Sequence, residues 1–474
     1  MAGLNHSLNI GSESLLASRQ GVDTTGHNIA NAQTEGFSRQ RVNLATRQPS
    51  VSRGYVIGNG VFVKSIDRAH DSFLEKQIVG GIQDLGTSEA YHENLKALEN
   101  IYSPELSTTV VESMDQFFTA LQNLSNFPED QTTRTYVKET GENLTDTFGR
   151  IDGQLSDARS VIDERVTGQV QEINNLISEI TRYNTTLKDV ATSAQQDSAD
   201  LLDKQDLLLR KLAENLDVSY YRTDQGTITV RGPGETLLID RDQHANLGVR
   251  TDQSGAGTHD IFVQGGSAAG VLKITDKIKR GSLGGLIAVR DEVIPKLIHS
   301  NNEMAYALVQ NFNEIHRSGF GINRFSGISG RDFFDIDSNI NNAARSIRVN
   351  DAIHEDVSSI SIASTPYAPG DNVLANMLLR LKHEPLMGER QQNMNEYYAE
   401  YVGSLGLEIS QAASLKDADK VLVDGLNARR EAVSGVSMDE EATNLLKWQA
   451  AFTASSKLIT TVDEMMETVL GLKR

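Results

Sequence analysis

The sequence predicts an elongated α+β protein of several domains, with terminal helices that form a coiled-coil core, a body domain of long helices and a small inserted β domain. Three observations support this fold class. Apolar residues recur every seven positions at both ends, long helical patterns fill most of the interior, and short β-type runs cluster between residues 217 and 275. A chain of 474 residues also exceeds the usual size of one domain.

The composition excludes several classes of function. A formal net charge of −19, without any large Lys/Arg cluster, argues against a nucleic-acid partner, because phosphate binding needs a basic face. The chain has no cysteine, which rules out disulfides and cysteine-ligated zinc. No apolar run approaches the roughly 20 residues of a membrane span, and the first thirty residues lack the pattern of a secretory signal. We therefore expect no membrane partner and no cleaved signal peptide.

The amino-terminal segment predicts a helix that lies close against another helix. Large apolar residues recur at intervals of seven, and the second seam position of the heptad is always small. The large residues are Leu8, Leu15, Val22 and Ile29, and the small ones are Gly11, Ser18, Thr25 and Ala32.

The carboxyl-terminal segment has the same period. One seam position holds Met438, Leu445, Phe452, Ile459 and Met466, and the second holds Trp448, Ser455, Val462 and Val469. Ser437 and Glu440 read as a capping box, and three successive acids in the first turn suit the positive end of the helix dipole. We interpret the Asp439-Glu440-Glu441 run as a helix start rather than a metal site.

The interior is read as a nested series of elements. The predictions are a hairpin over 41–68 turning at Gly58-Asn59-Gly60, helices over 86–126 and 133–215, β strands over 217–275, a helix over 283–318 kinked at Pro295, a mixed region over 319–371, and helix over 372–431. The expected domains are 1–40 with 435–474 as a helical inner core, 41–216 with 276–434 as the helical body, and 217–275 as an inserted outer β domain. Such nesting brings the two ends of the chain to one pole.

No motif indicates an active site or a cofactor. The ten histidines form no metal-binding or triad pattern. Asp335 and Asp337 begin like a calcium loop, but Ile340 and Ser346 stand where glycine and glutamate are required. We therefore expect no enzyme activity, no metal and no cofactor.

The terminal helices present an energetic problem that assembly would solve. Ordering a residue costs roughly 1–2 kcal/mol of backbone entropy, and each seam is too narrow to offset this for thirty residues. We therefore expect the ends to pair with each other and with the ends of neighbouring copies. The predicted assembly interface comprises Leu8, Leu15, Val22, Asn28, Ile29, Asn31, Gly36, Phe37, Met438, Leu445, Trp448, Phe452, Ile459, Val462 and Met466.

The segment NIANAQTEGFSRQRV (28–42) admits two readings. Asn28 and Asn31 stand where the helix should stop, Gly36 can adopt the left-handed conformation of a tight turn, and Phe37 can anchor that turn. The residues are equally compatible with an ordinary helix stop and loop.

Both ends resemble the signatures of bacterial flagellar axial proteins, the family of rod, hook and hook-associated proteins. The segments are LLASRQGVDTTGHNIANAQTEGFSRQRV and SGVSMDEEATNLLKWQAAFTASSKLITTVDEMMETVLGL. The hook-associated members are the most similar, through Ser38-Arg39-Gln40, Ser434-Gly435-Val436-Ser437, Leu283-Gly284-Gly285-Leu286 and Phe312-Asn313. The resemblance is strong over the first 75 and last 45 residues and weak over 86–275. Trp448 and Phe452 stand where Phe and Tyr are commoner.

The resemblance implies a structural role in joining the flagellar hook to the filament. Copies of the chain would form a ring-like tubular segment, with the hook protein on the proximal side and a second junction protein and the filament on the distal side. The protein would lie outside the cell, exported by the flagellar type III apparatus with an uncleaved signal and a chaperone at the carboxyl-terminal helix. The alternatives are another axial protein, such as a hook or rod component, and a soluble coiled-coil adaptor.

Overall fold

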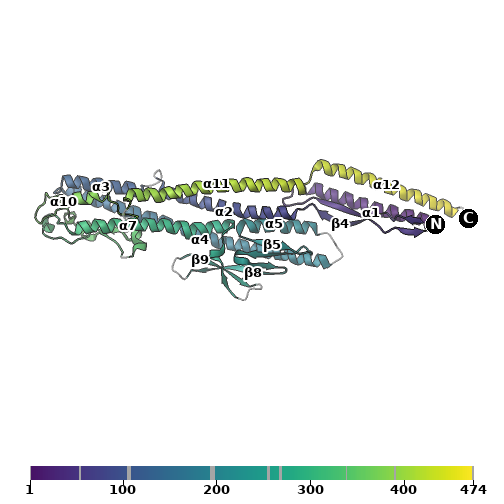
Figure 1. The fold of residues 1–474 in the computed structure, drawn as a ribbon, viewed down its shortest axis with the longest axis horizontal. Coiled ribbons are helices and arrows are strands. Elements are labelled where there is room, and N and C mark those ends of the chain that lie inside the picture. The colour runs from purple at the N-terminus through teal and green to yellow at the C-terminus, as the bar shows by residue number, and fades with distance from the viewer. Residues whose placement is uncertain are drawn as a thin grey trace.

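The computed structural model describes residues 2–52, 55–103, 108–192, 198–252, 257–265, 270–337, 339–388 and 391–471. The molecule is long and narrow, and both ends of the chain lie at the same pole (Figure 1). A pair of terminal helices forms this pole, a bundle of long helices forms the body, and a small sheet packs on one side of the bundle. The predicted elongated α+β fold with a helical body and a β insertion is confirmed.

The terminal pole consists of two helices and a β-hairpin. Helix α1 spans Ala2–Ala30, and helix α12 spans Met438–Gly471. The hairpin contains β1 (Gln40–Thr46) paired with β4 (Val61–Arg68), and β2 (Ser50–Ser52) paired with β3 (Tyr55–Ile57), all antiparallel. The expected turn at Gly58-Asn59-Gly60 is wrong, because β3 pairs with β2 and not with β4. Gly60 instead joins β3 to β4 with φ +79°, and its carbonyl accepts from Arg47.

Five helices form most of the body: α2 (Ser72–Tyr102), α3 (Val110–Asn126), α4 (Gln131–Thr192), α5 (Ala199–Asn215) and α11 (Met394–Ser434). The first predicted helix begins 14 residues earlier than expected, because the Asp71 side chain caps the amides of Phe73 and Leu74. It is also divided in two, since Thr109 and Glu112 start α3 with a capping box. The helical pattern predicted over 133–215 is confirmed in α4 and α5.

The β insertion is a six-stranded antiparallel meander in the order β10-β9-β8-β7-β6-β5. Its strands are β5 (Ser219–Arg222), β6 (Ile228–Gly232), β7 (Thr236–Asp240), β8 (Gln243–Thr251), β9 (His259–Gly265) and β10 (Leu272–Lys273). The inner face packs on α4, where Asn174 bonds both backbone groups of Leu247 and Asn184 bonds both of Ile228. One hydrophobic cluster runs through sheet and helices, so the sheet shares its core with the body.

The chain returns to the bundle through α6 (Gly281–Ala288), a π-helical turn (Val289–Val293) and α7 (Ile294–Arg317). Pro295 lies at the start of α7, so the change in helix type falls just before the residue that lacks an amide hydrogen. Within the turn, buried Arg290 pairs with Asp163 of α4 at 2.7 Å and donates to the carbonyl of His259. This side chain therefore ties helix, turn and sheet together.

The far pole is a mixed region, as predicted. It contains β11 (Phe334–Asp335) paired with β12 (Arg348–Val349), and the short helices α8 (Ala343–Ser346), α9 (Asp351–Glu355) and α10 (Val373–Arg380). Short 3-10 helices occur at Pro233–Glu235, Thr275–Lys277, Asn323–Phe325, Ile340–Asn342 and Val357–Ser359. The helix predicted over 372–431 is interrupted between α10 and α11. Four aromatic rings, packed tilted or edge-on to one another, fill this end of the core: Phe117, Phe312, Phe333 and Phe334.

Candidate assembly surface and the neck that carries it

The two terminal helices form an antiparallel pair. The hydroxyls of Ser14 and Ser455 are 2.8 Å apart, and Asn28 donates to Glu441 at 3.1 Å. The sum of the two residue numbers is constant along the contact, as an antiparallel register requires. The helices approach closely, since a Cβ built on Gly11 would lie 2.9 Å from Cγ1 of Ile459.

The seam on α1 is made of small and polar residues. The residues that face α12 are Gly11, Ser14, Ser18, Gly21, Thr25 and Asn28, and all except half-buried Ser14 are buried. Three residues of the predicted small line, Gly11, Ser18 and Thr25, therefore lie in the seam, whereas Ala32 falls beyond the end of α1 at Ala30. The second line runs through Ser14, Gly21 and Asn28 instead of the large residues. Close approach of the backbones selects for small side chains at the centre of this contact.

The large residues of α1 lie along one edge of the helix pair and are only half-buried: Leu8, Leu15, Val22 and Ile29. On α12 the corresponding line is Met438, Leu445, Phe452, Ile459 and Met466. Leu445, Ile459 and Met466 are half-buried, whereas Met438 is 53% exposed and Phe452 is 37% exposed.

Helix periodicity places both lines on the same side of the pair. The large residues of α1 lie four positions after the seam residues that begin with Gly11, and those of α12 lie four positions after the seam residues that begin with Glu441. In an antiparallel pair of helices, positions with this same offset fall on one flank. The hairpin occupies the other flank, where Val42 of β1 lines a cleft with Asn444 and Trp448. We call these nine large residues the apolar edge.

Two other predicted residues lie in the seam itself. Trp448 packs over Gly21, and Val462 is one of the few fully buried residues of α12. Leu446, Leu458 and Met465 of α12 are exposed without being part of the predicted set. Helix α12 therefore presents far more apolar surface than α1 covers.

Asn28 is buried within the chain and connects three segments. Its amide nitrogen donates to the carbonyl of Gln40 at 2.9 Å and to Glu441, and its oxygen accepts from the Gln40 amide at 2.9 Å. The end of α1, the start of the hairpin and the first turn of α12 are thus held by one side chain.

Asn31, Gly36 and Phe37 form the turn that follows α1. Asn31 donates to the carbonyl of His27, and Gly36 has φ +80°, which favours glycine. The Phe37 ring packs edge-on against His27 with centroids 5.5 Å apart. The predicted left-handed turn at Gly36 and the anchoring of that turn by Phe37 are confirmed, and both residues make these contacts within the chain.

Arg39 forms ion pairs with the first turn of α12, next to the contacts of Asn28. The Arg39 guanidinium lies 2.5 Å from Glu440 and 2.6 Å from Glu441, and the Arg39 amide donates to the Ser434 carbonyl at 2.8 Å. Burial lowers the pKa of Arg39, but the hydrogen bonds and charges of the two glutamates more than offset this and raise it. Glu441 is buried, so this ion pair is shielded from solvent.

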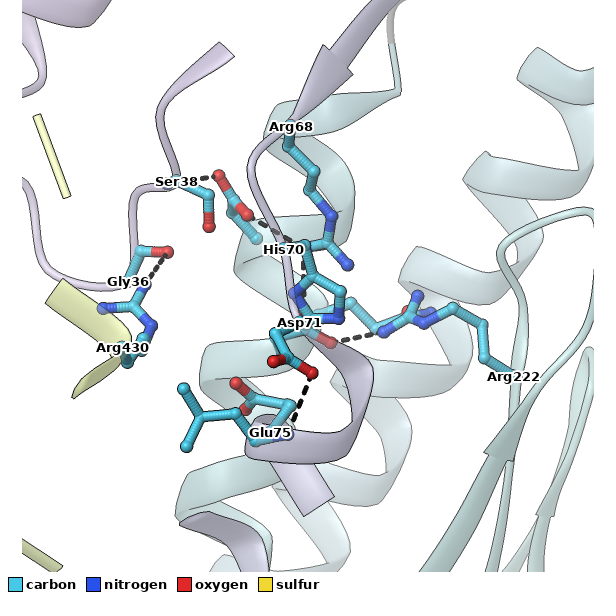
Figure 2. Close-up of polar contacts among 12 residues, drawn as sticks. Gly36, Ser38, Arg68, His70, Asp71, Glu75, Arg222 and Arg430 are labelled. Carbon is cyan, nitrogen blue, oxygen red and sulfur yellow. Dashed lines mark hydrogen bonds and ion pairs between the residues drawn. The ribbon is translucent and has the colours of Figure 1, made fainter. Parts of the chain in front are cut away.

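A second buried network joins the turn to the body. Asp203 of α5 accepts from the amide of Ser38 at 2.8 Å and pairs with Arg68 at 2.8 Å, while Asp206 binds Arg68 and Arg222. Figure 2 shows Arg68 and Arg222 beside the turn that carries Gly36 and Ser38, with Arg430 of α11 donating to the carbonyl of Gly36 at 3.0 Å. We call residues 28–40 with these partners the neck.

Sequence reasoning missed the partners in the neck. Arg68, Asp203, Asp206, Arg222 and Arg430 lie in different elements, and no local pattern marks them. Burial and the charge of Arg68 lower the pKa of nearby His70, which disfavours its protonated form. The neck therefore connects the terminal helices to the body through buried polar contacts.

The described residues give no sign of a metal or membrane site. No group of three or more histidine, aspartate or glutamate side chains could hold a metal ion in that part of the chain. No described helix combines the length and hydropathy needed to cross a membrane.

Comparison with known proteins identifies the family. Residues 95–334 match the flagellar hook-associated protein FlgK helical domain, and residues 431–472 match the C-terminal domain of the flagellar basal body rod FlgEFG proteins. Flagellar hook-associated protein 1 of Bacillus subtilis is 26% identical over 96% of each chain. That of Salmonella typhimurium is 23% identical over 99% of each chain, in an alignment of 562 positions, so this relative carries insertions.

A solved structure confirms the fold. The flagellar hook junction protein FlgK from Burkholderia pseudomallei superposes with a TM-score of 0.68 at 14% identity, covering 76% of this chain and 100% of that one. The FlgK helical-domain model covers just over half of the 474 residues. The chain therefore belongs to the flagellar hook-associated protein FlgK family.

Proposed function

We propose that the chain is a structural component of the bacterial flagellum that joins hook to filament by assembling into a ring-like tubular segment. The apolar edge of the terminal helices is the observation that carries this proposal. A pair of helices with a narrow seam of small residues leaves its large apolar side chains half-buried or exposed. Neighbouring copies would bury them.

The energetics favour completion of the pair by other subunits. Fully burying a large apolar side chain contributes roughly 1.5–3 kcal/mol, whereas glycine and serine contribute little. Since the α1 seam consists of small residues, the pair recovers little of the entropy lost in ordering about sixty residues. The apolar edge supplies the missing burial once copies meet, and the neck holds it in a fixed orientation relative to the body.

The proposed partners follow from this position. They are other copies of the chain, the hook protein on the proximal side, a second junction protein and the filament on the distal side, and an export chaperone at α12. The protein would act outside the cell at the hook–filament junction, exported without a cleaved signal peptide. It would act without catalysis, because the terminal surfaces provide packing contacts rather than a reactive group.

The proposal is tested with Phe452→Asp in a host whose own gene has been deleted. Phe452 is exposed on the apolar edge, so the monomer should fold and melt like the wild type, while incorporation into flagella and motility are lost. Thr453→Asp is the control, since this exposed residue lies about 100° further around the helix. Leu445→Asp and Ile459→Asp should also abolish assembly, although Ile459 additionally lies against Gly11 of α1. Normal incorporation of Phe452→Asp into flagella would contradict the proposal.

A further inference from the structure

Helix α11 has a second face that no described element covers. Its inner face packs on α2 through Ala412, Val423 and Leu426, where a Cβ built on Gly81 would lie 3.2 Å from Val423. Residues at helical spacing on the opposite side are all exposed: Gly403, Leu407, Gln411, Ser414, Leu415, Ala418, Val421, Leu422 and Gly425. We call this set the α11 outer face. It lies on the side of the molecule away from the β sheet (Figure 1).

The α11 outer face is apolar and free of charge. Leu407 is 60% exposed and Val421 is 73% exposed. Between Tyr401 and Lys416 the only charged residue is Glu408, which accepts from Tyr91 of α2 and so points toward the body. Of the charged residues that follow, Lys420 is rotated about 100° from Val421, whereas Asp417 and Asp424 lie one turn from Val421 and border the face.

A solvent-facing helix of a monomeric protein normally carries charges on its outer side. Helix α4 of this chain follows that rule, since Glu139, Asp157, Glu164 and Glu179 are exposed along it. The contrast within one molecule shows that α11 is not an ordinary surface helix.

The glycines of α11 are a second, independent observation. Gly403 and Gly425 of the α11 outer face lie inside the helix, and a Cβ built on either of them would meet no atom within 4 Å. Glycine destabilises an exposed helix interior relative to alanine, and nothing within the chain requires it at these positions. A close approach by a backbone from outside would require it, as Gly81 allows α2 to approach α11 inside the fold.

We propose that the α11 outer face packs against a second copy of this chain, so that neighbouring subunits touch through their bodies as well as their terminal helices. This inference rests on the proposed assembly into a ring. The set from Gly403 to Gly425 spans about 33 Å along the long axis of the molecule, which suits a helix of similar length laid alongside.

Charge also favours a second copy as the occupant. Each chain carries a formal charge of −19, so two copies lying side by side repel each other wherever acidic surfaces meet. A contact between copies therefore needs a surface without acidic groups. The part of the α11 outer face from Gly403 to Leu415 meets this requirement, because its only charged neighbour, Glu408, is bonded to Tyr91. The face is also a ridge rather than a groove, and ridges on helices pack against other helices.

A photoreactive residue tests the contact directly. The full chain, with p-benzoylphenylalanine in place of Leu415, is expressed in the deletion host, and its flagella are irradiated and the products identified by mass spectrometry. The expected product is a covalent dimer of the chain. The same residue is placed at Val161 of α4, which is 56% exposed, as a negative control, and at Phe452 as a probe of the apolar edge.

The outcomes separate this inference from the proposed function. Cross-linking from Leu415 to a different protein, or none from Leu415 while Phe452 yields dimers, overturns the inference and leaves the ring intact. Failure of the wild-type chain to enter flagella overturns both. As a second measurement, Leu415→Glu should reduce incorporation at least about tenfold, whereas Val161→Glu should change it by less than about twofold. Equal incorporation of the two variants contradicts the inference.

Discussion

Gly21 of α1 faces the indole ring of Trp448 of α12 so closely that a Cβ at position 21 would lie 2.3 Å from the ring. Real side chains do not approach to this distance, so the pair depends on the absence of a side chain there. The register of the terminal helices is therefore set by a glycine and an aromatic residue more than 400 positions apart in sequence.

Gly21→Ala should force the two helices apart or displace the indole. Overpacking of this kind costs about 1–3 kcal/mol, here against the pairing of α1 with α12. Trp448 is the only tryptophan, so its fluorescence emission should shift to longer wavelength as the ring gains solvent. Gly26→Ala is the control, because its Cβ would meet nothing within 4 Å. Identical spectra for the two variants would show that the seam tolerates a side chain.

Glu441→Gln should loosen the first turns of α12. The substitution leaves Arg39 buried without its shielded partner, and breaking a buried ion pair costs about 3–5 kcal/mol. Glu440 binds the same guanidinium but is largely exposed, so Glu440→Gln should cost less than about 1 kcal/mol. Hydrogen exchange of residues 438–448 in the two variants measures how much each substitution destabilises the start of α12. Comparable protection in the two variants would mean that burial of Glu441 adds nothing.

The folded body should lose stability in acid through His316. This side chain is fully buried, accepts from the Ser361 amide at 2.9 Å, and contacts the Arg331 carbonyl at 2.8 Å. Burial lowers its pKa to about 4, from an ordinary value of 6.5. Between pH 6.5 and 4 the His316 side chain is protonated in the unfolded chain but not in the folded chain. The free energy of unfolding therefore falls as the pH drops from about 6.5 to about 4.

The loss attributable to His316 should reach about 3 kcal/mol at pH 4 and increase no further below it. Urea unfolding at several pH values, compared between wild type and His316→Gln, isolates this contribution. The variant should be less stable at pH 7 but flatter between pH 6.5 and 4. Parallel curves for the two proteins would argue against a depressed pKa.

Deletion of residues 217–275 should destabilise the helical body. The sheet covers α4, and Ile173 and Ile177 of α4 share one hydrophobic cluster with Ile228 and Val230 of the sheet. Removing the strands exposes these side chains, each contributing roughly 1.5–3 kcal/mol when buried. Thermal unfolding followed by circular dichroism gives the test. An unchanged melting temperature of the remaining body would show that 217–275 is an independent insertion.

Much of the fold was predictable because it depends on local periodicity. The heptads at both ends, the long helix that became α4 and the short strands after Asp217 all have repeats that survive without tertiary information. Helix boundaries were less accurate, because the cap at Asp71 and the capping box at Thr109 reset them. The turn expected at Gly58-Asn59-Gly60 failed because glycine there serves a connection between two pairs of strands.

The candidate site was predictable only in part. The small residues Gly11, Ser18 and Thr25 were placed in the seam, but the large heptad residues proved to line its edge. Periodicity predicts which residues share a helix face, but it does not predict which element packs against that face. The neck could not be predicted for the same reason, since Asn28 bonds Glu441 and Ser38 bonds Asp203 across more than 160 residues.

Hydrogen exchange of the purified full chain, read segment by segment, tests most directly the claim that the terminal helices depend on neighbouring copies for their stability. We predict that α1 and α12 exchange much faster than α4 and α7, because the seam between them buries few large side chains. Protection of α1 and α12 equal to that of α4 would contradict the account, since the seam would then suffice to hold the pair without assembly.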